Sequence, residues 1–268
     1  MKIRDKVFVI TGAGSGMGRE MTIQIVKLGG KVAMADINIP GMEETADLAG
    51  RDSVSLHELN IMDKTAVEAL PKAVIEAHGQ VDAIINNAGI IQPFVNVEEL
   101  EYATIERIFN INLYGTIYMT KAFLPLLKER PEAHITNISS MGGFIPFPGQ
   151  TMYSASKAAV KILTEGLYAE LKETNVGVTV VHPGAINTNI MSNSGVKTKA
   201  QESAQKSDKA DKMAMPAAKA ASIIINGIEK NKYRVLVGKD AKFLDLFYRL
   251  SPAAAVRFIV RQMSKVDL

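Results

Sequence analysis

The sequence predicts one α/β domain in which a doubly wound parallel sheet of seven strands lies between two layers of helices. Three observations support this. Short apolar runs alternate with stretches of helical periodicity, a glycine-rich loop joins the first run to the first helical stretch, and 268 residues with 47% apolar content can bury a full core. The strands are expected at Val7–Ile10, Lys31–Ala35, Val54–Leu59, Val81–Ile85, His134–Ile138, Val176–Val181 and Arg234–Val237. With no internal repeat and no linker, residues 1–268 are interpreted as a single domain.

The first strand is followed by a loop suited to binding a pyrophosphate. Thr11-Gly12-Ala13-Gly14-Ser15-Gly16-Met17-Gly18 comes directly before a helix expected from Met17 to Leu28. Glycines let the backbone approach a phosphate closely, and the amides at the start of a helix favour its negative charge. A P-loop is excluded because no Lys-Ser/Thr pair follows. The commonest dinucleotide fingerprint is also excluded, because it needs glycine or alanine where Met17 stands.

The second strand ends at Asp36, which follows Gly18 at the spacing expected of a ribose-binding carboxylate. Such a carboxylate accepts hydrogen bonds from ribose hydroxyls, so the loop and Asp36 together predict a dinucleotide site.

Tyr153 and Lys157 lie four residues apart in a helix expected from Thr151 to Thr174. Positions i and i+4 share one face, so the ammonium can act on the phenol. At about 4 Å and an effective dielectric of about 20, the attraction is worth roughly 4 kcal/mol, or about three pKa units. The pair is therefore expected to lower the pKa of Tyr153 and make it a usable acid or base, although taken alone it also fits an exposed helix surface.

The pattern Thr-Gly-x-x-x-Gly-x-Gly, together with Tyr153-x-x-x-Lys157, resembles the short-chain dehydrogenase/reductase family from Lys6 to about Gly238. The resemblance implies a three-layer Rossmann fold and hydride transfer between a nicotinamide and a carbonyl or carbinol carbon. It implies that Tyr153 exchanges the proton, Ser140 binds the substrate oxygen, and Lys157 lowers the Tyr153 pKa and holds the nicotinamide ribose. Asn112 would hold a water that connects Lys157 to solvent.

The resemblance also implies the cofactor and its contacts. Asp36 would repel a 2′-phosphate, and Ser15 and Ile37 stand where family members that use the phosphorylated cofactor often carry Arg or Lys, so NAD(H) is predicted. Asn60 replaces the more usual Asp beside the adenine, and still offers a donor and an acceptor. The expected cofactor residues are Gly12, Ser15, Gly16, Met17, Gly18, Asp36, Ile37, Asn60, Ile61, Asn86, Ala88, Gly89, Tyr153, Lys157, Pro183, Gly184, Ile186 and Thr188.

The sequence gives less information about the substrate than about the cofactor. Residues near the matched positions are expected either to line an apolar pocket for a steroid, alkyl or aryl secondary alcohol or to pack within loops; they are Met141, Phe144, Phe147, Gln150 and Met191. The competing enzyme is a 3-oxoacyl-thioester reductase, against which the NAD signature argues. A hypothesis of another class is a non-catalytic NAD(H)-sensing module, which the presence of all the matched catalytic residues disfavours.

Composition limits the other functions. The net charge is +3, from 31 basic and 28 acidic residues, and no basic stripe predicts nucleic-acid binding. The absence of cysteine excludes disulfides and thiolate chemistry, and the four histidines lack metal-ligand spacing, so no metal is expected. Without a leader-like start or a long apolar run, a cytoplasmic protein with a small-molecule substrate is predicted.

Two features concern assembly and the outer parts of the chain. A long helix expected from Glu98 to Lys128 and the helix carrying Tyr153 predict, by resemblance, a homodimer or homotetramer. Residues 189–215 are expected to form a lid over the substrate. Residues 239–268 are expected to form two basic amphipathic helices. These could lie on a membrane, but packing against the lid or a neighbouring subunit is favoured. Because every matched cofactor residue precedes Gly238, this extension is not expected to contribute to cofactor binding.

Overall fold

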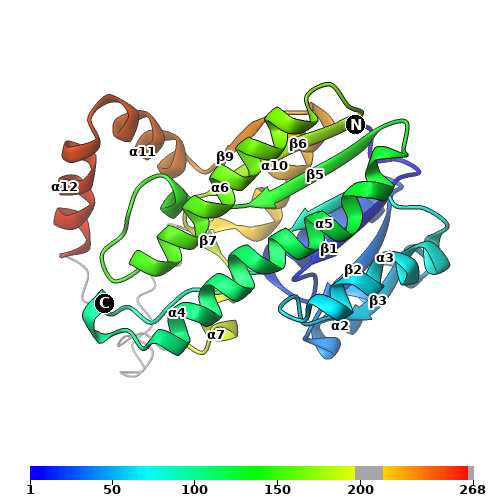
Figure 1. Ribbon diagram of the computed structural model, residues 1–268, viewed down its shortest axis with the longest axis horizontal. Coiled ribbons are helices and arrows are strands. Elements are labelled where there is room, and N and C mark those ends of the chain that lie inside the picture. Colours follow the sequence, from blue (N-terminus) through cyan, green and yellow to red (C-terminus); the bar gives the residue numbers. More distant parts are fainter. Residues whose placement is uncertain (197–213, 265–268) are drawn as a thin grey trace.

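The computed structural model describes residues 1–196 and 214–264, and its centre is a sheet of seven parallel strands (Figure 1). The strands are β1 (Val7–Thr11), β2 (Lys31–Asp36), β3 (Val54–Glu58), β4 (Ala83–Asn86), β5 (Ala133–Ile138), β6 (Val176–Pro183) and β9 (Arg234–Val237). Their order across the sheet is β3-β2-β1-β4-β5-β6-β9, and every neighbouring pair runs parallel. The predicted doubly wound Rossmann fold is therefore confirmed.

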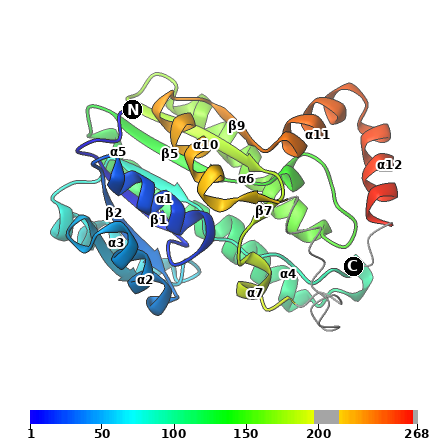
Figure 2. The same ribbon diagram turned by 180° about the vertical axis from the view of Figure 1, so that it is seen from behind.

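Helices cover both faces of the sheet, and each face has its own apolar core. One core joins the sheet to α1 (Gly16–Lys27), α2 (Ile39–Ala49) and α10 (Ala217–Glu229), which Figure 2 shows in front. The other core joins the opposite face to α3 (Lys64–His78), α5 (Gly115–Lys128) and α6 (Thr151–Leu171). Because β1 and β4 are buried along their whole length, they consist of nearly continuous apolar runs, whereas β5, which is equally buried, also carries His134, Thr136 and Asn137.

The chain changes direction across the sheet between β1 and β4. From β1 it proceeds outward to β2 and β3, then returns to β4 beside β1 and continues to β5, β6 and β9. Ligands of doubly wound sheets bind at such a switch point, beyond the carboxyl ends of the strands. The glycine loop after β1 and the loop after β4 meet there.

The prediction of one long helix from Glu98 to Lys128 is wrong in one respect, because the segment is divided into several helical elements. A short 3₁₀ turn, η2 (Val97–Glu99), is followed by α4 (Tyr102–Phe109), a π-helical turn, η3 (Asn110–Tyr114), and then α5. The π turn carries Asn112, whose buried side chain bonds the backbone of Ile90 in the loop after β4. π turns inside helices are frequent at functional sites.

Several short elements lie beyond the carboxyl ends of β5 and β6. They include η4 (Met141–Gly143), α7 (Ile190–Asn193) and a two-stranded pair formed by β7 (Ile186–Asn187) and β8 (Met215–Pro216). Most of the expected lid, residues 197–213, lies outside the described residues.

The C-terminal extension forms α11 (Lys239–Leu250) and α12 (Pro252–Met263), seen beyond the β9 edge of the sheet in Figure 1. Their inner side packs with Ile145 and its neighbours Met141, Phe144 and Phe147 in the loop after β5. The expected partner was the lid or a neighbouring subunit, so the sequence did not indicate this contact within the chain. On the outer side Phe243, Leu246 and Leu250 remain exposed. Within residues 1–196 and 214–264, no helix has the length and apolarity needed to cross a bilayer.

Candidate active site

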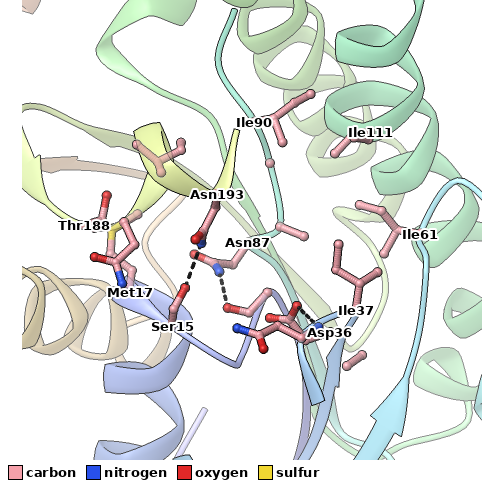
Figure 3. A pocket seen from close by; sticks show the side chains of 18 of the residues that line it. Ser15, Met17, Asp36, Ile37, Ile61, Asn87, Ile90, Ile111, Thr188 and Asn193 are labelled. Carbon is pink, nitrogen blue, oxygen red and sulfur yellow. Dashed lines mark hydrogen bonds between the residues drawn. The ribbon is translucent and has the colours of Figure 1, made fainter. Parts of the chain in front are cut away.

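A cavity of about 290 Å³ opens at the switch point between β1 and β4 (Figure 3). Residues predicted for the cofactor line it: Gly12, Ser15, Gly16, Met17, Asp36, Ile37, Asn60, Ile61, Ala88, Gly89 and Thr188. Other lining residues were not predicted: Ala35, Asn38, Leu59, Asn87, Ile90, Arg107, Ile111, Asn189, Ile190 and Asn193.

In the glycine loop no side chain at Gly12 or Gly16 separates the backbone from the cavity. Gly12 has φ +69°, and a Cβ there would lie 2.9 Å from Asn87 Nδ2. A Cβ at Gly18 would overlap the carbonyl oxygen of Gly12, so Gly18 is needed for the close packing of α1 on the loop although it does not line the cavity. This cradle and the start of α1 fit a pyrophosphate.

Asp36 is held in place at the rim of the cavity by backbone amides. Its Oδ2 accepts a hydrogen bond from Gly14 N at 2.8 Å, and its Oδ1 accepts one from Asn38 N at 3.0 Å. Ile37, with 70% of its surface exposed, stands beside it. The carboxylate is therefore fixed before any ligand arrives, and no basic side chain at position 37 offsets its charge.

The two asparagines after β4 have different tasks. Asn86 is buried, and its Nδ2 donates to Asn137 Oδ1 at 2.8 Å, so it ties β4 to β5 and does not line the cavity. Asn87 does line it, and its Nδ2 donates to Thr11 O at 3.0 Å. Asn86 was expected to contact the cofactor, but its neighbour Asn87 lines the cavity in its place, because successive side chains of a strand point to opposite faces.

The expected catalytic residues gather beyond the end of β5. Lys157, which is 4% exposed, donates from Nζ to Ile138 O at 3.0 Å. A Cβ at Gly89 would lie 3.0 Å from the same Nζ, so the ammonium adjoins a residue that lines the cavity. Ser140 Oγ accepts a hydrogen bond from Gly142 N at 3.0 Å, and the Tyr153 ring lies beside Gly142. The three side chains thus meet next to the cleft but outside the residues that line it.

The expected lowering of the Tyr153 pKa is wrong for this structure. Burial raises the pKa of the Tyr153 phenol, and hydrogen bonding with the Ser140 side chain only partly opposes the change. Burial also lowers the pKa of Lys157 to about 8. The sequence argument counted the attraction of the ammonium but not the loss of water around both groups, and the Lys157 ammonium bonds a backbone carbonyl.

Asn112 is fully buried and connects three segments. Its Nδ2 donates to Ile90 O at 3.0 Å and to Ser156 Oγ at 2.9 Å, and its Oδ1 accepts from Ile90 N at 2.9 Å. Both amide hydrogens are therefore engaged by protein, and a water would have to use the remaining lone pair of Oδ1. The side chain fixes the loop after β4 against α6.

Two positioning residues were missed by the sequence analysis. Gln92 is fully buried, and its Oε1 accepts hydrogen bonds from Met152 N at 2.8 Å and Tyr153 N at 3.0 Å, so it caps the helix that carries Tyr153. His182 Nδ1 lies 2.9 Å from Ser140 O, and burial lowers the His182 pKa to about 4, so the neutral ring donates to that carbonyl. Neither contact has a local signal, because the partners are 60 and 42 residues apart.

None of the residues expected to contact the substrate lines the cavity. Met141 and Phe144 pack against the C-terminal extension. Gln150 is 5% exposed and donates from Nε2 to Gln92 O at 2.8 Å, while Met191 lies on α7. Pro183, Gly184 and Ile186 also stay outside the cavity, in the turn that leads to Thr188. Among the described residues, no cluster of His, Asp or Glu has a metal-binding arrangement.

Known proteins resemble this chain in sequence and in structure. The profile of the family described as short chain dehydrogenase matches residues 6–199. SadH of Mycobacterium tuberculosis, whose name assigns it to the oxidoreductases, is 37% identical over 266 residues, which cover 97% of this chain and 96% of SadH.

Two solved structures share the fold over most of the chain. A short-chain dehydrogenase/reductase from Burkholderia phymatum, in complex with NAD, has a TM-score of 0.81 and 28% identity, covering 88% of this chain and 90% of its own. The 3-ketoacyl-(acyl-carrier-protein) reductase of Brucella melitensis, complexed with NADH, has a TM-score of 0.78 and 27% identity, covering 88% of this chain and 97% of its own.

Proposed function

The chain belongs to the short-chain dehydrogenase family, and we propose that it is an NAD(H)-dependent oxidoreductase that interconverts a secondary alcohol and a ketone. The observation that carries the proposal is the position of Lys157 beside Gly89, at the edge of the glycine-loop cleft, with Ser140 and Tyr153 together beside Gly142 after the same strand, β5. A proton-transfer group thus adjoins a dinucleotide cradle.

The choice of NAD(H) rests on Asp36. Its carboxylate is anchored by Gly14 N and Asn38 N, so it cannot easily swing away from a 2′-phosphate. Repulsion of about 1.4 kcal/mol would give roughly a tenfold preference for the unphosphorylated cofactor. The Burkholderia relative was solved with NAD, in agreement with this choice.

Each residue of the site then has a physical task. The cofactor, when bound, supplies or accepts the hydride at its nicotinamide ring. Because burial raises its pKa, the Tyr153 phenol keeps its proton at neutral pH and can donate it to the oxygen of a ketone. Ser140, held through His182 and Gly142, orients that oxygen. Lys157 directs its ammonium to the edge of the cleft, where a ribose hydroxyl would lie.

For the substrate we propose an apolar alcohol or ketone of the steroid, alkyl or aryl type, because Ile90, Ile111 and Ile190 give the cavity apolar lining. The alternative, a 3-oxoacyl-thioester reductase, has gained support, because the Brucella relative of that activity was solved with NADH. NAD preference therefore no longer separates the two. A non-catalytic NAD(H) sensor is the alternative without chemistry.

We also propose that the protein is a cytoplasmic homodimer or homotetramer. Ile162 on α6 and Tyr114 before α5 are large apolar side chains with 62% and 47% of their surface exposed, which is consistent with a contact between subunits. Sedimentation velocity and cell fractionation test the two statements.

The proposed activity is tested by a screen of ketones, 3-oxoacyl thioesters and secondary alcohols with NAD(H), followed by Tyr153→Phe on the best substrate. This change removes one oxygen, so turnover should fall by about 10² or more while NADH affinity stays near that of the parent. Near-parental turnover of Tyr153→Phe would remove this residue from the chemistry. NADH binding without turnover of any compound would favour the sensor.

A further inference from the structure

The turn after β6 is fixed by three separate parts of the chain. Gly184 N donates to Val237 O at the end of β9 at 2.8 Å, and Met215 N donates to Ala185 O at 2.9 Å. The third contact comes from the C-terminal extension, because Ala185 N donates to Asp240 Oδ2 at 2.7 Å. Asp240 lies in the first turn of α11, so the extension reaches back to the turn that leads into the cleft.

The backbone is shaped to admit this carboxylate. A Cβ on Gly184 would overlap the Asp240 carboxylate, and so would a Cβ on Gly238. Gly238 also has φ +113°, a conformation that a residue with a side chain rarely adopts. Two glycines, 54 residues apart in the printed sequence, therefore leave room for one side chain. This arrangement is more specific than a chance surface contact.

The turn held by Asp240 leads directly to the cleft. Thr188, three residues after Ala185, lines the cavity, and a Cβ on Gly16 of the glycine loop would lie 3.3 Å from Thr188 Cβ. Any shift of the turn is therefore passed to a wall of the cofactor site.

We propose that Asp240 is a positioning residue for the nicotinamide end of the cofactor, acting through the turn after β6. The inference rests on the proposed NAD(H) function, and it replaces the sequence-based expectation that residues after Gly238 do not contribute to cofactor binding. The carboxylate accepts from a main-chain amide, and such charge-assisted bonds are among the stronger ones in proteins. Its loss lets the turn relax.

The same helix provides a matched control. Asp245 is 2% exposed and pairs with Arg234 at 2.6 Å and with Arg249 at 2.9 Å. Like Asp240, it is a carboxylate on α11 bonded to the body of the protein. Its partners lie in β9 and on α11, and the turn after β6 is not among them. Loss of Asp245 should loosen α11 without releasing Ala185.

The test compares two ligands that differ at one end. NADH contains the nicotinamide, whereas ADP-ribose contains only the adenosine, the pyrophosphate and a ribose. We titrate both into the full-length parent, Asp240→Ala, Asp240→Asn and Asp245→Ala, with thermal melting to verify folding. Asp240→Ala should lose roughly tenfold in NADH affinity, the typical worth of a hydrogen bond to a charged group, and less than about twofold in ADP-ribose affinity. Asp240→Asn, which keeps an acceptor oxygen, should lose less.

The outcomes separate the inference from the function on which it rests. Equal losses for NADH and ADP-ribose, or no loss for either, would overturn the role of Asp240. The proposal would also be overturned if Asp245→Ala lost as much NADH affinity as Asp240→Ala while keeping its ADP-ribose affinity. The effect would then belong to α11 as a whole and not to the contact between Asp240 and Ala185. If the parent itself binds neither ligand, the proposed function fails first. If Asp240→Ala does not fold, the test rests on Asp240→Asn. A ratio of NADH to ADP-ribose affinity equal to that of the parent would then contradict the proposal.

Discussion

The cofactor cleft and the catalytic side of the molecule are built in different ways. The cleft is formed mainly by backbone groups. Gly12 and Gly18 allow the close approach of the turn and α1, and Gly14 N donates a hydrogen bond to Asp36, 22 residues later. On the catalytic side, buried side chains join distant segments. Gln92 bonds the backbone of Tyr153 over 61 residues, and Asn112 bonds Ser156 over 44.

This difference determines how each part responds to change. A cleft made by close backbone approach leaves no room for a side chain at Gly12 or Gly18. A catalytic side made by buried side chains depends on contacts that also set its electrostatics, because the same burial raises the pKa of Tyr153 and lowers that of Lys157. Substitutions in the two regions should therefore differ in what they affect: cofactor affinity in the first, turnover in the second.

The largest effect is expected from the smallest added group in the cleft. Gly18→Ala places a methyl group where the Gly12 carbonyl oxygen lies, so the loop must move and lose its close approach to the pyrophosphate. Loss of about two hydrogen bonds to a charged group, about 3 kcal/mol, would weaken NADH binding by roughly 10². The control is Gly166→Ala on α6, where nothing lies within 4 Å of the added Cβ. Fluorescence titration of NADH should show a loss only for Gly18→Ala, and equal affinities in the two variants would contradict this account of the loop.

A smaller effect is expected when the charge at the rim of the cavity is changed. Asp36→Ala with Ile37→Arg removes a repulsive carboxylate and adds a cation at an exposed position. The ratio of NADPH to NADH affinity should rise by about tenfold or more, since about 1.4 kcal/mol of repulsion is removed. Calorimetric titration of the parent provides the reference. Equal or tighter binding of NADPH by the parent would contradict the assignment of Asp36.

The same contrast explains what could be predicted from sequence. The seven strands, the glycine loop and the place of Asp36 follow from apolar runs and short motifs, which are local. The contact of Asn112, on the π turn, with Ile90 could not be predicted, because the two residues are 22 positions apart. The direction of the Tyr153 pKa was wrong because burial is a property of the folded chain. The roles of Gln92 and Asp240 have no signal in the residues around them.

The smallest effect, and the one that most sharpens the comparison, concerns Gln92. Its Oε1 caps α6 by accepting from Met152 N and Tyr153 N, yet the side chain does not line the cleft. Gln92→Met keeps the length and removes the acceptor, so the first turn of α6 should loosen. The loss of a helix cap costs about 1 kcal/mol, and we expect turnover to fall roughly fivefold with NADH affinity unchanged.

Gln92→Glu restores an acceptor at the positive end of the helix and should recover part of the turnover, although it buries a charge. Steady-state kinetics and NADH titration of both variants decide the matter. If Gln92→Met lowers NADH affinity and turnover equally, or if Gln92→Glu is no better than Gln92→Met, this side chain supports the fold as a whole and does not place Tyr153.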